Sequence, residues 1–265
     1  MSRTLYGLAY SPWTERARWA LDHHRIPHRY REHLILIGEP SLRWRSRNAG
    51  TSKASVPLFV DGDLAIGDSL AIAQHADAVG RGAPLGTDHP DFAAFSARVE
   101  TALQAARALV TAAILADPEA LRESARAAAP ESLTPMMRPV AATAARFIAR
   151  KYSADLKADD RNRASIREVL TELRQRRAET PYLQGEHFSA FDIWAATLLQ
   201  GVRPVAHTYI KLSPAVERAW TQPELAREFE DLISWRNRIY QLHRHGPADA
   251  SAVSASVSQS ASARF

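Results

Sequence analysis

The sequence predicts an α/β domain followed by an all-helical domain. Three observations predict this fold class. Strand-like and helix-like runs alternate over residues 1–80, glycine and proline concentrate in residues 81–90, and only helical periodicity follows. The second domain should extend over residues 91–246, and residues 81–90 should form the linker that joins the two.

The first domain has the expected order strand, helix, strand, helix, strand, strand, helix. The corresponding ranges are residues 4–10, 13–24, 29–37, 41–48, 56–60, 64–66 and 68–76. The first strand stops at a Ser-Pro pair, which is a common helix start. The turn Asp61-Gly62-Asp63 between two apolar runs is typical of a hairpin. We therefore expect a mixed four-stranded sheet.

In the second domain, apolar residues recur at helical spacing. The ranges are residues 92–114, 140–149, 165–176, 190–200 and 224–240. Four prolines between residues 116 and 139 exclude one continuous helix there and predict shorter pieces. Serine and alanine supply 12 of the 19 residues at 247–265, which predicts a disordered tail because such a segment cannot bury a core.

Composition narrows the class of protein. With 46% hydrophobic residues the chain can bury a sizeable core, and a net charge of +5 over 265 residues is weak support for a nucleic-acid partner. Arg174, Arg176 and Arg177 lie on a predicted amphipathic helix, so a solvated outer face is the favoured interpretation. No run approaches the roughly 18 apolar residues of a membrane span, and no signal peptide is recognisable, so we expect a cytoplasmic protein with no membrane partner.

Cysteine is absent from the sequence. This absence excludes disulfides and thiolate metal sites. Any thiol chemistry must therefore use a thiol that a ligand supplies. Adjacent His23 and His24 would point in different directions on a helix, and His243 with His245 stands beside the expected tail, so no metal is expected.

Ser11 and Pro12 stand where the first strand passes into the first helix. Serine is a good N-cap, and proline is tolerated at the first helical position because its missing donor would be unpaired there anyway. A capped helix explains this pair without any ligand. The same helix start would also stabilise a thiolate, because free backbone N–H groups, a partial positive charge and a hydroxyl donor favour an anion.

Val56 and Pro57 form the second candidate feature, at the start of a predicted strand. An ordinary trans proline at a strand entry is favoured by frequency alone. A cis bond would turn the backbone N–H and C=O of Val56 outward, where an extended peptide-like ligand could pair with them as a further strand does.

Asp68 and Ser69 place an acidic group and a hydroxyl side by side at a helix start. A plain helix cap explains the pair. A receptor for an amino-acid head group explains it as well, with the α-carboxylate on the backbone donors and Ser69 and the ammonium on Asp68.

The order and spacing of these three features in one βαβαββα unit resemble the glutathione-binding half of the cytosolic glutathione transferases. Residues 11–21 look like the first-helix segment of the serine-type members, and residues 55–72 are similar to their cis-proline hairpin and third helix. An independent match lies in the helical half, where Ser189 and Asp192 have the spacing of a capping box that starts a buried helix in this family. The resemblance implies a thioredoxin-like N-terminal domain and a helical-bundle C-terminal domain.

Carried over by position, the resemblance makes Ser11 the hydroxyl that stabilises the glutathione thiolate. Val56, with a cis Pro57, would pair with the cysteinyl backbone, and Asp68 with Ser69 would receive the γ-glutamyl head. Relatives often have a lysine just before the Val-Pro pair. Ser55 occupies that position here, which leaves Lys53 as the candidate for the glycyl carboxylate.

Two aromatic residues complete the expected site. Tyr10 competes with Ser11 as the thiol activator, because other members of the family use a tyrosine near the end of the first strand. We favour Ser11 on the Ser-Pro-aromatic pattern, with Tyr10 and Trp13 lining the cleft. The helical half is longer than usual before the capping box, over residues 117–160, so the wall of the electrophile site cannot be copied from the family.

The resemblance implies a homodimeric glutathione transferase whose bound thiolate attacks a hydrophobic electrophile. Conjugation, peroxide reduction and isomerisation all begin with that thiolate and stay open. The alternative is a protein of the same fold that binds glutathione or apolar ligands, or acts as an adaptor, without transfer activity. The absence of cysteine eliminates members of the fold that react through a protein thiol.

Overall fold

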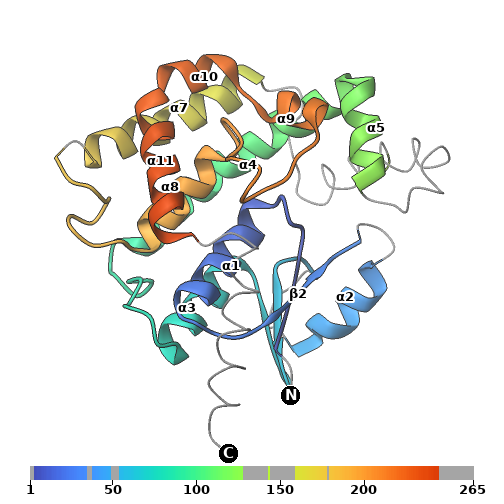
Figure 1. Ribbon diagram of the computed structural model, residues 1–265, viewed down its shortest axis with the longest axis vertical. Helices are drawn as coiled ribbons and strands as arrows, with labels where there is room; N and C mark the ends of the chain where they lie inside the picture. The colour runs from blue at the N-terminus through green and yellow to red at the C-terminus, as the bar shows by residue number, and fades with distance from the viewer. Residues whose placement is uncertain are drawn as a thin grey trace, which may run out of the picture.

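The computed structural model describes residues 3–34, 38–48, 54–127, 143, 159–177 and 179–244. Figure 1 shows a sheet domain that contains the N-terminus, with a larger helical domain packed above it. Several expectations lie outside the described residues: the helix at 140–149 except for residue 143, most of the segment 117–160, and the tail at 247–265.

The sheet has four strands, as the sequence predicts, and their order is β2-β1-β3-β4. The strands are β1 (Thr4–Gly7), β2 (Arg29–Glu32), β3 (Leu58–Asp61) and β4 (Leu64–Gly67). β1 pairs in parallel with β2 and antiparallel with β3, and β3 forms the antiparallel hairpin with β4. Parallel β1 and β2 need a crossover connection, which α1 (Pro12–His23) supplies.

Helices cover both faces of the sheet (Figure 1). On one face lie α1 and α3 (Ser69–Val79), and on the other lies α2 (Glu39–Arg45) with the short 3-10 helix Ser46–Asn48. The alternation of strand side chains follows from the pleat: Phe59 packs into the main core, whereas its neighbour Leu58 packs with Leu42 of α2. Both faces are therefore buried by apolar side chains.

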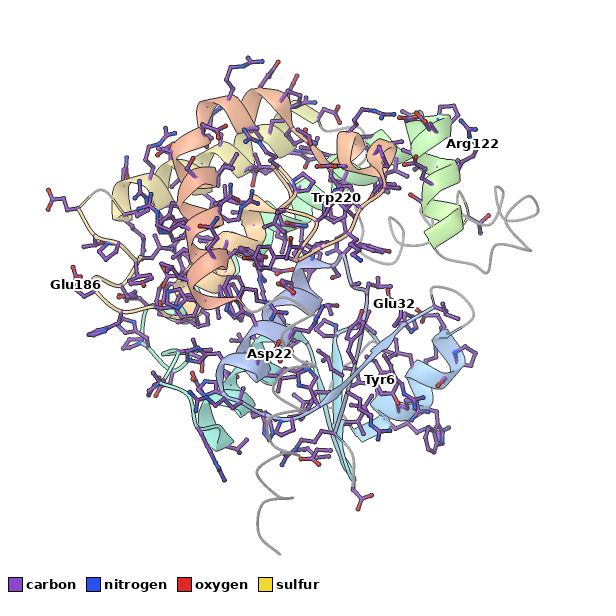
Figure 2. The ribbon with its side chains drawn as sticks, in the orientation of Figure 1. Tyr6, Asp22, Glu32, Arg122, Glu186 and Trp220 are labelled. Carbon is purple, nitrogen blue, oxygen red and sulfur yellow. The ribbon has the colours of Figure 1, made fainter. Side chains whose placement is uncertain are left out.

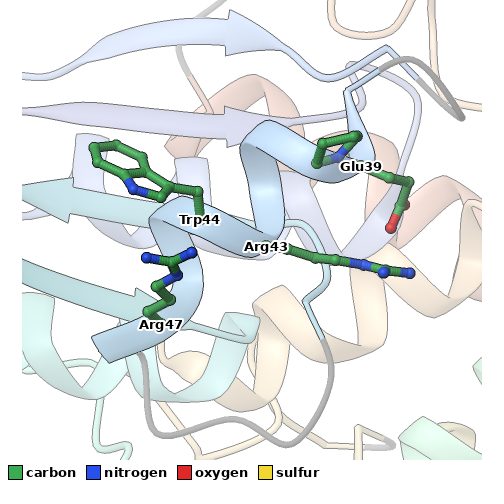
Figure 3. Close-up of a pocket in the computed structure, with 5 residues that line it drawn as sticks. Glu39, Arg43, Trp44 and Arg47 are labelled. Atoms are coloured by element: carbon green, nitrogen blue, oxygen red, sulfur yellow. The ribbon is translucent and has the colours of Figure 1, made fainter.

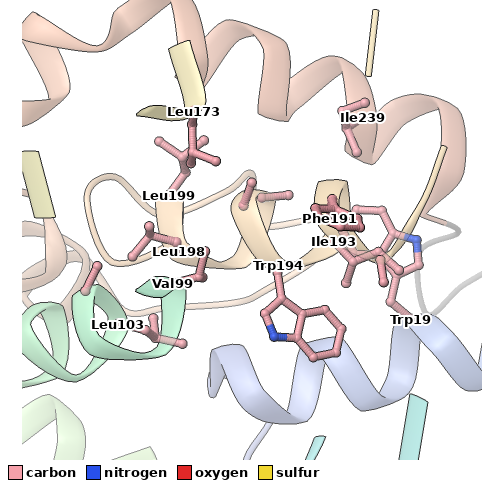
Figure 4. Packing of buried hydrophobic residues seen from close by; sticks show 14 of the residues in the cluster. Trp19, Val99, Leu103, Leu173, Phe191, Ile193, Trp194, Leu198, Leu199 and Ile239 are labelled. Atoms are coloured by element: carbon pink, nitrogen blue, oxygen red, sulfur yellow. The ribbon is translucent and has the colours of Figure 1, made fainter. Parts of the chain in front are cut away.

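The helical domain is built around α8 (Ala190–Leu199), all of whose residues are buried. Around it lie the other helices of the domain. They are α4 (Phe92–Ala116), α5 (Pro118–Ala127), α7 (Asp159–Arg176), α9 (Pro214–Trp220), α10 (Pro223–Glu228) and α11 (Glu230–His243). Figure 4 shows Trp194 of α8 pointing toward α1. One apolar core thus runs from the sheet domain into the helical domain.

α4 is the one described helix that is long and apolar enough to cross a membrane by length and composition. The sequence contains no such uninterrupted apolar run, and half of the most apolar window of α4 is buried in the protein. Its buried residues include Phe95, Val99 and Leu103, which pack in the main core. Burial in this core accounts for the apolar character of α4.

Two helical features differ from the sequence expectations. The helix expected over residues 224–240 is two helices, because Phe229 leaves helical geometry at φ −115° and ψ 33° while its ring stays fully buried. The helix α9 was not expected, although Ser213 and Pro214 repeat the Ser-Pro pair that marks the start of α1. Arg174 and Arg176 of α7 bind the carboxylates of Asp231 and Glu172 on the outer face.

Ser189 and Asp192 form a capping box at the start of α8. The fully buried Asp192 carboxylate accepts hydrogen bonds from the backbone N–H groups of Ser189 and Leu183, both at 2.8 Å, and from the Ser189 hydroxyl at 2.9 Å. Burial raises the pKa of Asp192 to about 6, although these hydrogen bonds favour the ionised form. The carboxylate therefore joins the loop before α8 to the helix itself.

Replacing Asp192 by alanine should destabilise the protein by about 2 kcal/mol at pH 7, because two buried N–H groups lose their acceptor. The raised pKa means that the folded state binds more protons than the unfolded state between pH ~4 and ~6. The difference in the free energy of unfolding between wild type and Asp192→Ala should therefore grow as the pH falls from about 7 to about 5. Urea unfolding at both pH values measures this difference. Asp231→Ala, which breaks an exposed ion pair, is the matched control and should cost under about 1 kcal/mol.

Candidate functional site

Strand pairing brings the three sequence motifs to one end of the sheet. The end of β1 and the end of β4 both pair with the beginning of β3. Ser11 follows β1, Pro57 precedes β3 and Asp68 follows β4. The residues expected at a glutathione site therefore lie at one end of the sheet, whereas the capping box lies in the helical domain.

Ser11 is the N-cap of α1 and is 8% exposed. Its Oγ accepts a long hydrogen bond of 3.5 Å from the Thr14 N–H. Its own N–H donates to the Leu8 carbonyl at 2.9 Å, and the Leu8 N–H donates to the Thr14 hydroxyl at 3.1 Å. The loop is thus fixed by its backbone, while the hydroxyl proton of Ser11 is not donated to any described residue. That donor is available to an anion above the helix N-terminus.

The Val56–Pro57 peptide bond is cis. Val56 is half-buried, and neither its N–H nor its C=O makes a hydrogen bond within the described part of the chain. These two groups lie just before β3, where the ladder with β1 begins. An extended ligand could pair with them as an additional strand.

Asp68 has φ 59° and ψ 157°, in a region that non-glycine residues rarely adopt. Its carboxylate accepts from the Ala71 N–H at 2.8 Å and so caps α3. Ser69 is 4% exposed, and no described residue bonds its hydroxyl. The first N–H groups of a helix have no partner within it. The start of α3 therefore presents unused donors beside an acidic side chain.

Glu32, at the end of β2, holds the loop that precedes Ser11. The sequence did not indicate this role of Glu32. Its carboxylate oxygens both lie 3.2 Å from the Ala9 N–H, and one of them accepts from the Tyr30 hydroxyl at 2.5 Å. Parallel pairing of Gly7 with Glu32 brings this carboxylate to the loop. Only the register of β1 on β2, which is a tertiary feature, reveals this role.

Tyr10 packs toward the helical domain. Its ring lies edge-on to Trp220 of α9, with the ring centroids 6.1 Å apart and an interplanar angle of 84°. Burial, reinforced by the negative charge of Glu32, raises the pKa of Tyr10 above its usual range. The phenol is therefore protonated at neutral pH. Figure 2 shows Trp220 on the helical side of the domain boundary and Glu32 on the sheet side.

Trp13 joins the two domains. Its indole N–H lies 2.9 Å from both carboxylate oxygens of Glu100 on α4, and the guanidinium of Arg107 lies 4.1 Å above its ring. The buried Arg16 donates to the same Glu100 at 3.2 Å and to the Thr197 hydroxyl at 2.9 Å. Burial, partly opposed by Glu100, lowers the pKa of Arg16 to about 10. These contacts fix the orientation of α1, and hence of Ser11, against the helical domain.

Two hollows of about 360 Å³ each are lined by other residues. One lies on α2 between Arg43, Trp44 and Arg47 (Figure 3), and the other lies beside α4 and α9. Neither hollow is lined by Ser11, Val56 or Asp68. Lys53 lies outside the described residues. No group of three or more metal-ligating side chains occurs among the described residues.

Residues 5–82 match the family model of the glutathione S-transferase N-terminal domain. A glutathione S-transferase of Ceriporiopsis subvermispora, solved in complex with glutathione, superposes with a TM-score of 0.61 at 17% identity, covering 93% of this chain and 99% of its own. A glutathione S-transferase of Methylobacillus flagellatus with bound glutathione gives 0.55 at 15% identity, covering 90% and 95%. No curated protein has a significantly similar sequence.

A glutathione S-transferase domain-containing protein of Marinobacter aquaeolei also superposes, with a TM-score of 0.55 at 18% identity and coverage of 89% of this chain and 97% of its own. The architecture is a thioredoxin-like domain followed by a helical domain. The chain has the fold of these glutathione S-transferases, and residues 5–82 match the model of their N-terminal domain.

Proposed function

We propose that this protein is a glutathione transferase of the serine type. It binds glutathione along the end of the sheet and holds the sulfur as a thiolate for attack on a hydrophobic electrophile. The observation that carries the proposal is the convergence of three sets of unused polar groups: the Ser11 hydroxyl, the backbone of Val56 and the start of α3.

The γ-glutamyl and cysteinyl parts of the tripeptide each have a complementary group among the described residues. The γ-glutamyl carboxylate binds the first N–H groups of α3 and the Ser69 hydroxyl, and its ammonium lies near Asp68. The cysteinyl backbone pairs with Val56 as an added strand. The sulfur then lies above the N-terminus of α1, where Ser11 donates a hydrogen bond that favours the thiolate over the thiol.

Glutathione binding can be measured by thermal unfolding. A ligand that binds only the folded state at 100 times its Kd stabilises by about 2.7 kcal/mol, so glutathione should raise the Tm by several degrees. Asp68→Asn is the matched variant: the amide keeps an oxygen for the Ala71 N–H but removes the charge that attracts the ammonium. It should keep the wild-type Tm without ligand and lose most of the glutathione shift.

An aryl halide assay then measures transfer. Stabilisation together with conjugate formation supports the proposal. A wild-type protein that glutathione does not stabilise contradicts it at the binding step. Stabilisation without turnover over a panel of electrophiles would instead support the alternative of a binding or adaptor protein with this fold.

A further inference from the structure

Next to Ser11, an apolar cluster joins the sheet domain to the helical domain. We call it the Trp220 cluster; its members are Tyr10, Val110, Ile114, Leu212, Val216 and Trp220. Val110, Val216 and Trp220 are buried, whereas Tyr10, Ile114 and Leu212 are only partly buried. The cluster is therefore closed at Val110, Val216 and Trp220, and it is partly open at Ile114, Leu212 and Tyr10, the neighbour of Ser11.

Trp220 carries an unused donor inside this cluster. Its indole N–H is buried and makes no hydrogen bond to any described group. A buried polar group without a partner is uncommon in folded proteins because its desolvation is not compensated. The other indole donors of this region differ: Trp13 donates to Glu100 and Trp19 donates to the His243 carbonyl. Packing alone does not require a tryptophan at 220, since phenylalanine would present a similar apolar ring.

Tyr10 supplies a second donor on the open side. Its hydroxyl makes no hydrogen bond to a described residue, and it is protonated because burial raises its pKa. The cluster thus combines apolar walls with two unused donors, and the hydroxyl oxygen of Tyr10 is the one acceptor among its side chains. Such a surface is complementary to a flat apolar molecule that carries a hydrogen-bond acceptor.

We propose that Trp220 is a specificity-determining residue that selects flat apolar electrophiles bearing a carbonyl-type oxygen, which accepts a hydrogen bond from its indole N–H. This inference rests on the proposed function, because it assigns the second substrate of the same site. For an unsaturated ketone, the glutathione sulfur would form a bond to the β-carbon while the C=C π electrons move toward the oxygen. A proton from Tyr10 or water then neutralises the enolate, so the addition needs no oxidant or reductant.

The proposal can be tested with a pair of ligands that have the same shape and do not react, 2-acetylnaphthalene and 2-ethylnaphthalene. Equilibrium dialysis in the presence of S-methylglutathione measures both affinities. In Trp220→Phe, the ratio of ketone affinity to hydrocarbon affinity should fall about tenfold from its wild-type value, while hydrocarbon affinity stays within about twofold. Val216→Ala, which removes apolar wall but no donor, should weaken both ligands and leave the ratio unchanged.

An unchanged ratio of ketone affinity to hydrocarbon affinity in Trp220→Phe would overturn the proposal. So would an equal decrease in the affinities for both ligands, since Trp220 would then act only through apolar packing. If Trp220→Phe does not fold, ¹⁵N spectra of the wild-type protein decide instead: the Trp220 indole resonance should shift downfield with the ketone and not with the hydrocarbon. The increase in Tm with glutathione is measured separately. If the wild-type protein shows no such increase, the proposed function is contradicted. A normal increase together with an unchanged affinity ratio would contradict only the role of Trp220.

Discussion

Replacing Ser11 by alanine should lower turnover with an aryl halide about 100-fold and leave the Kd for glutathione within a few-fold of wild type. The reason is that the hydroxyl meets the charged sulfur, whereas the γ-glutamyl and cysteinyl backbone groups of the ligand bind elsewhere. Removal of a single preorganised donor from an anionic site costs about this much in other enzymes. The pKa of the bound thiol should rise toward the value near 8.5 of a free thiol. Ultraviolet titration of the bound thiolate measures this pKa directly.

The matched variant is Tyr10→Phe, because Tyr10 is the other candidate activator. Its ring packs edge-on to Trp220, so loss of its hydroxyl should leave the thiol pKa close to that of wild type. The opposite pattern, with a raised thiol pKa in Tyr10→Phe and none in Ser11→Ala, would assign activation to Tyr10. Ser11→Ala also removes an N-cap, at a cost of about 1 kcal/mol, but the 3.5 Å bond to Thr14 indicates a weak cap. Glutathione affinity therefore serves as the internal control for correct folding.

The parts of the site that the sequence could predict are those that short-range chemistry dictates. A Ser-Pro pair starts a helix, a D-G turn closes a hairpin and an acidic N-cap starts another helix, each within a few residues. Their meeting at one end of the sheet follows from the register of β3 with its two neighbours. The resemblance to a known family implied that the three motifs form one site, but it did not give the register through which they meet.

Other parts depend on contacts between residues far apart in the sequence. Glu32 reaches the loop before Ser11 only through parallel pairing of β2 with β1, and Trp220 reaches Tyr10 only because α9 packs against α4. Arg16 is 1% exposed, because α8 covers it, and its guanidinium bonds Thr197. No local pattern distinguishes a buried arginine of this kind from a solvated one.

A second case is Arg244, which the sequence places beside the expected tail. It follows the end of α11, and its side chain is 4% exposed. Its Nε lies 2.8 Å from a carboxylate oxygen of the equally buried Glu15, and its Nη1 lies 2.8 Å from the carboxylate of the more exposed Asp22. Burial opposes its charge, but Glu15, together with Asp22 and Tyr240, outweighs burial and raises the pKa of Arg244 above its usual range. This ion pair attaches the end of the helical domain to α1, whose N-cap is Ser11.

Arg244→Met should therefore destabilise the protein by about 3 to 5 kcal/mol, because Glu15 would remain as a buried carboxylate without its partner. For a chain of this size that loss corresponds to a decrease in Tm of roughly 10 °C. Asp22→Asn, which weakens only the exposed half of the cluster, should cost less than about 1 kcal/mol. Urea unfolding of the three proteins gives these differences.

The double variant Glu15→Met with Arg244→Met separates a missing charge partner from missing packing. If the penalty of Arg244→Met arises from the unpaired Glu15 carboxylate, then removing both charges should recover most of the lost stability. A double variant that is less stable than Arg244→Met would show instead that the guanidinium acts mainly by filling space. Glu15 lies in the first turn of α1, and its backbone N–H donates to the Ser11 carbonyl at 2.9 Å. The double variant keeps this backbone bond and removes one positive and one negative charge together. It should therefore also keep the wild-type thiol pKa, which ties the pair to the stability of α1 and leaves thiolate stabilisation to Ser11.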